Sequence, residues 1–180
     1  FVKNDDDFGL KINYCPLDAV GTDRLINAFA ATEKYGAPSI VCSFGTATTF
    51  DVVGKGRELL GGTIAPGMKT MLKALHLHAA RLPHVELAKP ANLLGNTTAA
   101  AIQSGVFYGH IAMVEGMIRR SKRELAEKAL VIATGGFAPM TAANTDKIDI
   151  VDENLTLDGL RFMHQRIGKT AVTDSPRHSG

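Results

Sequence analysis

The sequence has little cysteine, little excess charge and no long apolar run, and each absence excludes a class of protein. Cys15 and Cys42 are too few for a disulfide framework, and Cys42 lies in an apolar run where it suits a small hydrophobic residue in a reducing cytoplasm. A net charge of +2 gives no reason to expect nucleic acid as a partner. No run can cross a bilayer. We therefore expect a cytoplasmic protein without membrane or nucleic-acid partners.

The composition is otherwise typical of a folded domain. The 180 residues are 45% hydrophobic and 21% charged, which suits one domain or one lobe of a larger protein. Because the chain begins at Phe1 without an initiator methionine, we expect it to be the later part of a longer protein. The polar residues 168–180 are expected to form a disordered tail after the folded residues 1–167.

Residues 40–66 carry a pattern of strands separated by glycine turns. The apolar residues 40–42 predict a buried strand, and the alternating residues 50–53 predict a second strand after the turn at residues 45–49. A further bend is expected at Gly61-Gly62. Glycine N–H groups and threonine hydroxyls in such a turn can bind phosphate, but an ordinary threonine-rich hairpin fits the pattern equally well.

Apolar spacing predicts helices over residues 21–35 and 67–82. Asp23 and Arg24 fall in the first turn of the earlier helix. The simplest interpretation is that Asp23 complements the helix dipole and that Arg24 is solvated.

A longer helix is predicted to begin after a cap at Thr97 or Thr98 and to end near residue 120. Gly105 and Gly109 lie one turn apart on it and permit close approach of a neighbouring helix. That neighbour can belong to the same chain or to the second copy in a dimer.

Residues 129–133 predict another buried strand, and Thr134-Gly135-Gly136 follows it directly. Ligands of open α/β sheets gather at the carboxyl ends of strands, so this turn is a candidate nucleotide site, with a plain strand-to-helix turn as the alternative. A short strand at residues 148–152 and a helix at residues 155–167 complete the prediction.

Several motifs, taken in order along the chain, resemble those of the type III pantothenate kinases. They are Gly21-Thr22-Asp23-Arg24, Phe44-Gly45-Thr46-Ala47-Thr48-Thr49-Phe50-Asp51, Gly61-Gly62-Thr63-Ile64-Ala65-Pro66-Gly67, Leu82-Pro83, Gly95-Asn96-Thr97-Thr98 with Ser104-Gly105, Thr134-Gly135-Gly136, and Leu155-Thr156-Leu157-Asp158-Gly159-Leu160. That family belongs to the actin–sugar kinase–heat-shock ATPase superfamily. The resemblance implies an α/β fold: an RNase H-like lobe of the actin/hexokinase ATPase type, with a mixed sheet flanked by helices. Residues 1–167 would be the C-terminal part of that fold.

The same resemblance implies ATP-dependent phosphorylation of pantothenate to 4'-phosphopantothenate, the first step of coenzyme A biosynthesis, with Mg²⁺ and a monovalent cation and in a homodimer. Asp23 matches the catalytic carboxylate that accepts the proton of the pantothenate hydroxyl, and Arg24 matches the anchor of the pantothenate carboxylate. The remaining positions match the pantothenate site (Tyr14, Gly21, Thr97, Thr98, the two threonines across a dimer interface) and the ATP site (Gly45, Thr46, Thr48, Thr49, Thr134, Gly135, Gly136). This assignment requires Asp23 and the hydroxyls of Thr46 and Thr48 to open on a common cleft.

The sequence departs from the family pattern in two places. Ser43 stands where the family has an aspartate associated with the monovalent cation, so binding of K⁺ or NH₄⁺ is expected to be weakened or lost. The family's first lobe, with its Asp-x-Gly-Asn-Thr phosphate loop, has no counterpart here. We therefore expect a kinase fragment with little or no activity alone. The alternative is a non-catalytic regulatory homologue that binds nucleotide or pantothenate.

Overall fold

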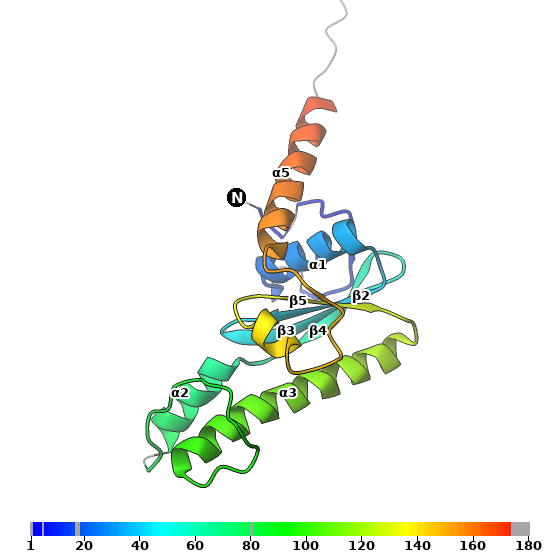
Figure 1. The fold of residues 1–180 in the computed structure, drawn as a ribbon. Helices are drawn as coiled ribbons and strands as arrows, with labels where there is room; N and C mark the ends of the chain where they lie inside the picture. The colour runs from blue at the N-terminus through cyan, green and yellow to red at the C-terminus, as the bar shows by residue number, and fades with distance from the viewer. Residues whose placement is uncertain (1, 5, 17–18, 80, 174–180) are drawn as a thin grey trace, which may run out of the picture.

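A six-stranded mixed sheet forms the centre of the computed structural model, which describes residues 2–4, 6–16, 19–79 and 81–173 (Figure 1). In spatial order the strands are β1 (Lys11–Ile12), β4 (Glu58–Pro66), β3 (Ala47–Gly54), β2 (Ser39–Phe44), β5 (Leu130–Thr134) and β6 (Ile150–Val151). Helices cover both faces. The structure therefore confirms the expected α/β fold with a mixed sheet flanked by helices.

The directions of the central strands bring two glycine turns to one edge of the sheet. Strands β2 and β3 are antiparallel, and the Gly45-Thr46 turn between them confirms the predicted hairpin. Strand β5 runs parallel to β2, so the carboxyl ends of both strands meet at that edge. Gly135 follows β5 with a φ of 90°, and the N–H of Phe137 donates to the carbonyl of Phe44 over 3.2 Å.

The bend expected at Gly61-Gly62 was wrong, because both glycines lie inside strand β4. Val52 pairs with Gly61 and Val53 pairs with Leu59, so Leu60 is an extra residue in the ladder. Gly61 has a φ of 139°, a conformation that favours glycine. A β-bulge therefore uses the glycine while pairing with β3 continues on both sides.

The helices divide between the two sheet faces (Figure 1). Helices α1 (Thr22–Tyr35) and α5 (Leu155–Thr173) pack on one face, and α3 (Thr98–Leu125) packs on the other; α2 (Met68–His78) lies beside α3, and the short α4 (Ala138–Ala142) follows β5. Helix α2 ends before the expected residue 82, and α3 continues beyond residue 120. Helix α5 continues past residue 167 into the segment expected to be disordered, and residues 174–180 of that segment lie outside the described residues.

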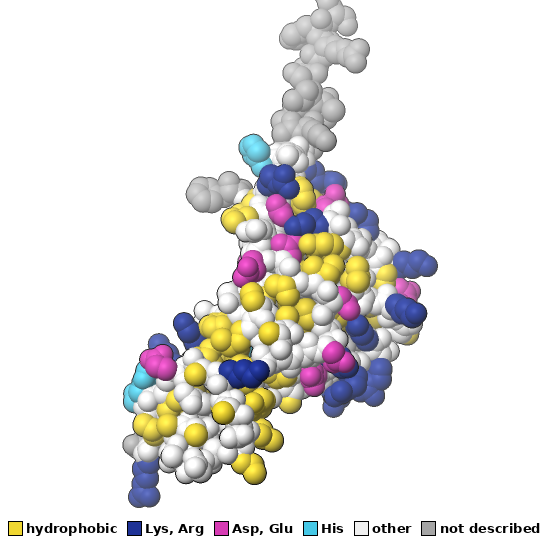
Figure 2. Space-filling view, in the orientation of Figure 1, with side chains coloured by type: hydrophobic (Ala, Val, Ile, Leu, Met, Phe, Trp, Pro, Cys, Tyr) yellow, Lys and Arg dark blue, Asp and Glu magenta, His cyan; other side chains and the backbone are white. Residues whose placement is uncertain are grey.

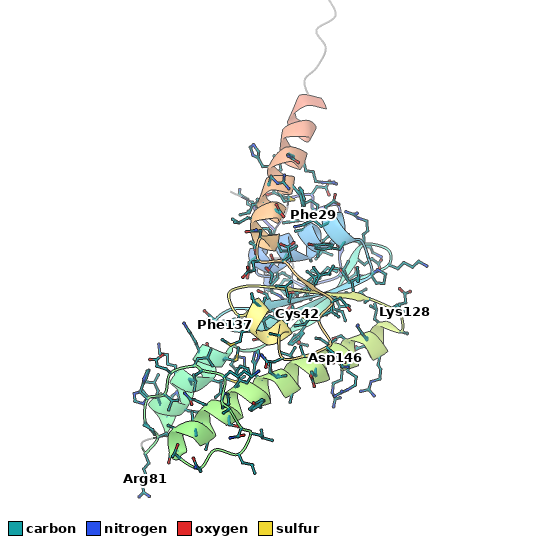
Figure 3. All side chains as sticks on the ribbon, in the orientation of Figure 1. Phe29, Cys42, Arg81, Lys128, Phe137 and Asp146 are labelled. Atoms are coloured by element: carbon teal, nitrogen blue, oxygen red, sulfur yellow. The ribbon has the colours of Figure 1, made fainter. Side chains whose placement is uncertain are left out.

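Alternation along the strands sends apolar side chains to both faces. Val41 and Val53 pack under α1 and α5, whereas Phe44 and Phe50 pack against α3. Phe29 lies on the α1 side and Cys42 lies in the sheet (Figure 3). Cys42 is fully buried, as expected, and burial raises the pKa of its thiol.

A second apolar cluster lies off the sheet, between α2 and the first half of α3. Its members are buried side chains of both helices: Met68, Leu72, Val106, Phe107 and Ile111. We call α2 together with residues 98–111 of α3 the α2–α3 arm, which extends away from the sheet (Figure 1). Within the described part of the chain, no helix has both the length and the apolar character that a membrane span requires.

Candidate functional site

A buried ion pair lies under the first turn of α1. Arg24 donates from Nε over 2.9 Å and from Nη2 over 2.5 Å to the same carboxylate oxygen of Asp51, on β3. Both residues are almost inaccessible, with exposed fractions of 5% and 1%. The ring centroid of Tyr14 lies 5.5 Å from the Arg24 guanidinium carbon. Arg24 is therefore not the solvated residue of the simplest interpretation, and much of its hydrogen-bonding capacity is occupied by Asp51.

The charge of Asp23 affects the Arg24–Asp51 pair. Burial lowers the pKa of Arg24, but the hydrogen bonds and charge of Asp51, helped by Tyr14, outweigh burial, so the net pKa lies above its ordinary value. Burial raises the pKa of Asp51 against the opposing effect of Arg24, and the negative charge of Asp23 adds to that rise. Asp23 itself is exposed. The structure thus leaves one accessible carboxylate beside a buried, largely neutralised pair.

Two glycines make room for these groups. A Cβ at Gly62 would lie 2.6 Å from Asp51 Oδ1 and 2.7 Å from Arg24 Nη2, and a Cβ at Gly21 would lie 2.5 Å from Asp23 Oδ1. Sequence reasoning included neither Asp51 nor Gly62 among the candidate site residues. The signal that could have found Asp51 is a charged residue at an inward-facing position of an otherwise apolar strand, which demands a buried partner.

Three hydroxyls continue the polar surface along the same sheet face. Ser43 pairs with Thr49 on one side and with Thr134 on the other, so the three side chains form a row. Thr49 donates to Asp51 Oδ2 over 3.3 Å. These neutral oxygens suit weak binding of a monovalent cation, and no group of three or more His, Cys, Asp or Glu side chains in the described residues could hold a metal ion.

Thr48 does not share this face, contrary to expectation. Alternation turns its side chain toward α3, where its hydroxyl lies 2.8 Å from His110 Nε2 and only 1% of the residue is exposed. Thr48 and Asp23 therefore do not open on a common cleft, so the expectation for Thr48 was wrong and this geometry does not support the kinase assignment. The neighbouring Thr49 is the hairpin threonine that lies on the Asp23 side.

Acidification is expected to destabilise the fold through His110. Burial holds the pKa of His110 below its ordinary value of 6.5, and its Nδ1 is buried without a partner. Below that pH the unfolded chain takes up a proton that the folded chain resists, so the free energy of unfolding falls. Urea unfolding from about pH 7.5 to about pH 5 measures this slope. A His110→Gln variant is expected to show a shallower slope; an unchanged slope would assign the effect to other groups.

The predicted nucleotide turns lie beside lysines that sequence reasoning missed. Gly45, Thr46 and Gly136 line a cavity of about 410 Å³ together with Lys69 and Lys73 of α2. Phe137, which lines the same cavity, lies close to the start of α2 (Figure 3). Two of the predicted ATP-binding segments are thus brought together by the fold.

Thr97 and Thr98 lie far from Asp23 within one chain. Thr97 caps α3, its side-chain oxygen accepting from the N–H of Ala100 over 3.1 Å, and both threonines are exposed. Thr98 begins the α2–α3 arm and Thr97 directly precedes it, so both lie at the start of α3, the helix on the sheet face opposite α1 (Figure 1). The chain alone does not unite the predicted pantothenate site.

Comparison with solved structures identifies the fold. A conserved putative Baf family transcriptional activator from Campylobacter jejuni superposes with a TM-score of 0.63 at 22% identity, over 90% of this chain and 71% of that one. The activator of the 2-hydroxyisocaproyl-CoA dehydratase from Clostridium difficile, solved with bound ADPNP, superposes with a TM-score of 0.50 at 10% identity, over 86% of this chain and 70% of that one. The fold is the actin-like ATPase fold, as the motifs implied.

Sequence comparison identifies the family. The family model described as "Type III pantothenate kinase" matches residues 1–120. The type III pantothenate kinase of Brevibacillus brevis is 48% identical over 158 residues, which cover 88% of this chain and 62% of that protein. That of Rhodospirillum rubrum is 46% identical over 162 residues, covering 90% and 63%. The chain therefore spans slightly less than two thirds of these relatives, and it belongs to the type III pantothenate kinase family.

Proposed function

We propose that the complete product of the gene encoding this chain phosphorylates pantothenate with ATP to give 4'-phosphopantothenate, the first step of coenzyme A biosynthesis. Family membership over residues 1–120 carries the proposal. The accessible Asp23 carboxylate, beside a buried pair that fixes the first turn of α1, supports it.

In the proposed reaction Asp23 accepts the proton of the pantothenate hydroxyl. The hydroxyl oxygen forms a bond to the γ-phosphorus while the bond between that phosphorus and the bridging oxygen breaks, and its electron pair leaves with ADP. Because the transition state is loose, positioning contributes more than the strength of the base, and an ordinary aspartate suffices. The Arg24–Asp51 pair keeps the helix turn that carries Asp23 in place. Arg24 has donors that Asp51 does not use, but because the residue is buried, their contact with the pantothenate carboxylate would require the side chain to become accessible.

The ATP phosphates are proposed to lie at the Gly45-Thr46 and Gly135-Gly136 turns, where backbone N–H groups can approach them. Mg²⁺ would neutralise phosphate charge, bound mainly by phosphate oxygens and water, since the described residues offer it no carboxylate cluster. Ser43, with Thr49 and Thr134, would hold a monovalent cation only weakly.

We further infer that the pantothenate pocket is completed by a second copy of the chain. A largely apolar groove of about 810 Å³ runs between α2 and α3, and Thr98 and Gly105 line it. Exposed hydrophobic side chains are visible at this end of the molecule, as they are elsewhere on the same face (Figure 2). If a second copy of the chain bound in this groove, Thr98, which lines the groove, would lie at the dimer interface. Sedimentation equilibrium is expected to show a dimer that Gly105→Arg dissociates, because the open space at Gly105 is then filled; a monomeric parent would contradict the inference.

The function is tested by pantothenate-dependent formation of ADP from ATP, with and without K⁺. The complete gene product is expected to turn over and to depend little on K⁺, while residues 1–180 alone are expected to show little or no activity. Binding of both substrates by the complete protein without turnover would support the regulatory alternative and contradict the kinase.

A further inference from the structure

The cavity beside the two nucleotide turns is positively charged. Lys69 and Lys73 lie four residues apart on α2, so their side chains leave the same side of the helix, and both are exposed. No ion pair is found for either lysine among the described residues, and no acidic residue lines the cavity. Two unneutralised ammonium groups at one concave surface favour an anionic ligand.

The backbone around the cavity is held in place by contacts between its three segments. The carbonyl of Thr46 accepts from the N–H of Gly67 over 2.9 Å and from Thr70 Oγ1 over 2.7 Å, which ties the hairpin turn to α2. The N–H of Phe137 bonds the Phe44 carbonyl, as described above, and ties the Gly135-Gly136 turn to β2. The lysines and both glycine turns are therefore presented in one fixed arrangement before any ligand binds.

The ammonium of Lys69 is oriented by an aromatic ring. Its Nζ lies 5.5 Å from the ring centroid of Phe137, the residue directly after Gly136, within the range of a cation–π interaction. Beside Gly136, a Cβ would meet no atom within 4 Å, so the space next to that backbone is open. A phosphate group placed there would contact a lysine and an accessible backbone at the same time.

We propose that Lys69 and Lys73 form a binding site for the phosphate chain of a nucleotide. The nucleotide as ligand rests on the proposed function, whereas the polyphosphate chemistry rests on the cavity itself. A lysine side chain binds phosphate as a flexible point charge, so the two side chains can each contact a different phosphate group of a polyphosphate. The purine and ribose would extend away from the phosphate groups and make no contact with these lysines.

Calorimetric titration of the 180-residue chain with sodium tripolyphosphate, ATP and adenosine tests the proposal. In the Lys69→Ala/Lys73→Ala double variant, the Kd values for tripolyphosphate and ATP are expected to rise at least about tenfold, the equivalent of about 1.4 kcal/mol. Binding of adenosine, if it occurs in the parent, is expected to be unchanged. The Lys69→Arg/Lys73→Arg variant, which keeps both charges, is expected to retain most of the affinity.

Lys55→Ala is the matched control, because Lys55 is exposed in the turn at the other end of β3 from Gly45. The lysine site would be overturned by any of three results. The control could lose as much affinity as the double variant, the double variant could keep the ATP affinity of the parent, or the parent could fail to bind tripolyphosphate and ATP. Unchanged ATP affinity would leave the proposed function intact. Lysine-dependent binding of tripolyphosphate by a complete protein that does not turn over pantothenate would support the site and contradict the proposed function.

Discussion

Replacing Asp23 by Asn is expected to lower kcat for pantothenate phosphorylation by about 10²–10⁴-fold in the complete protein, the usual contribution of a general base. The amide has the shape of the carboxylate but cannot accept the hydroxyl proton. Because Asp23 is exposed, folding should be preserved. KM for pantothenate should change much less than kcat, since the lost interaction belongs to the transition state.

The measurement is the steady-state rate of pantothenate-dependent ADP formation for parent and variant. Asp146→Asn is the control, because Asp146 is an exposed acid whose partner is the adjacent Lys147, away from α1 (Figure 3). If Asp23→Asn turns over as fast as its parent while Asp146→Asn is also unaffected, Asp23 is not the base and the proposed mechanism fails.

Replacing Asp51 by Ala is expected to lower the free energy of unfolding by about 3–5 kcal/mol, the cost of leaving one partner of a buried pair without its counter-charge. Arg24 would remain buried with two donors that no longer have an acceptor. Urea unfolding of the 180-residue chain measures the change, and an unchanged m-value would show that the comparison is sound.

Two further variants separate the ion pair from simple loss of volume. The Arg24→Met/Asp51→Leu double variant is expected to recover most of the loss, because an apolar pair of similar size needs no counter-charge. Asp7→Ala breaks the exposed pair with Arg166, at 2.7 Å, and is expected to cost no more than about 1 kcal/mol. A double variant as unstable as Asp51→Ala would mean that the pair matters for packing and not for charge.

Much of the fold could be predicted from local patterns. The hairpin around Gly45, the long helix capped by Thr97 and the buried strand before Gly135 each depend on residues close together in sequence, and the structure confirms them. The bulge at Gly61 was missed because a glycine pair in a strand and a glycine pair in a bend have the same sequence signature. Only the ladder with β3 distinguishes them.

The sequence identified several residues of the candidate site by their type, but not the residues with which they interact. The pattern of Asp23 and Arg24 was recognisable, but the crossing of α1 over β3 decides that Arg24 is buried against Asp51. Strand alternation shows that the side chains of Thr48 and Thr49 lie on opposite faces of the sheet. Which of them lies on the Asp23 side is known only once α1 and α3 are assigned to their faces. Lys69 and Lys73 became candidates only because α2 docks on the hairpin turn, a contact between segments that no local pattern encodes.

Thr70 lines both the cavity beside Lys69 and the apolar groove of the α2–α3 arm, and its hydroxyl holds the Thr46 carbonyl. A displacement of this turn of α2 from the groove side would act on that hydrogen bond, and through it on the loop on the other side. If a second copy binds the groove and an anion binds the cavity, as proposed, the two binding events would then be linked, and each would change the affinity of the other by the same factor. The Thr70 side chain would in this way couple dimer formation at the groove to anion binding at the cavity.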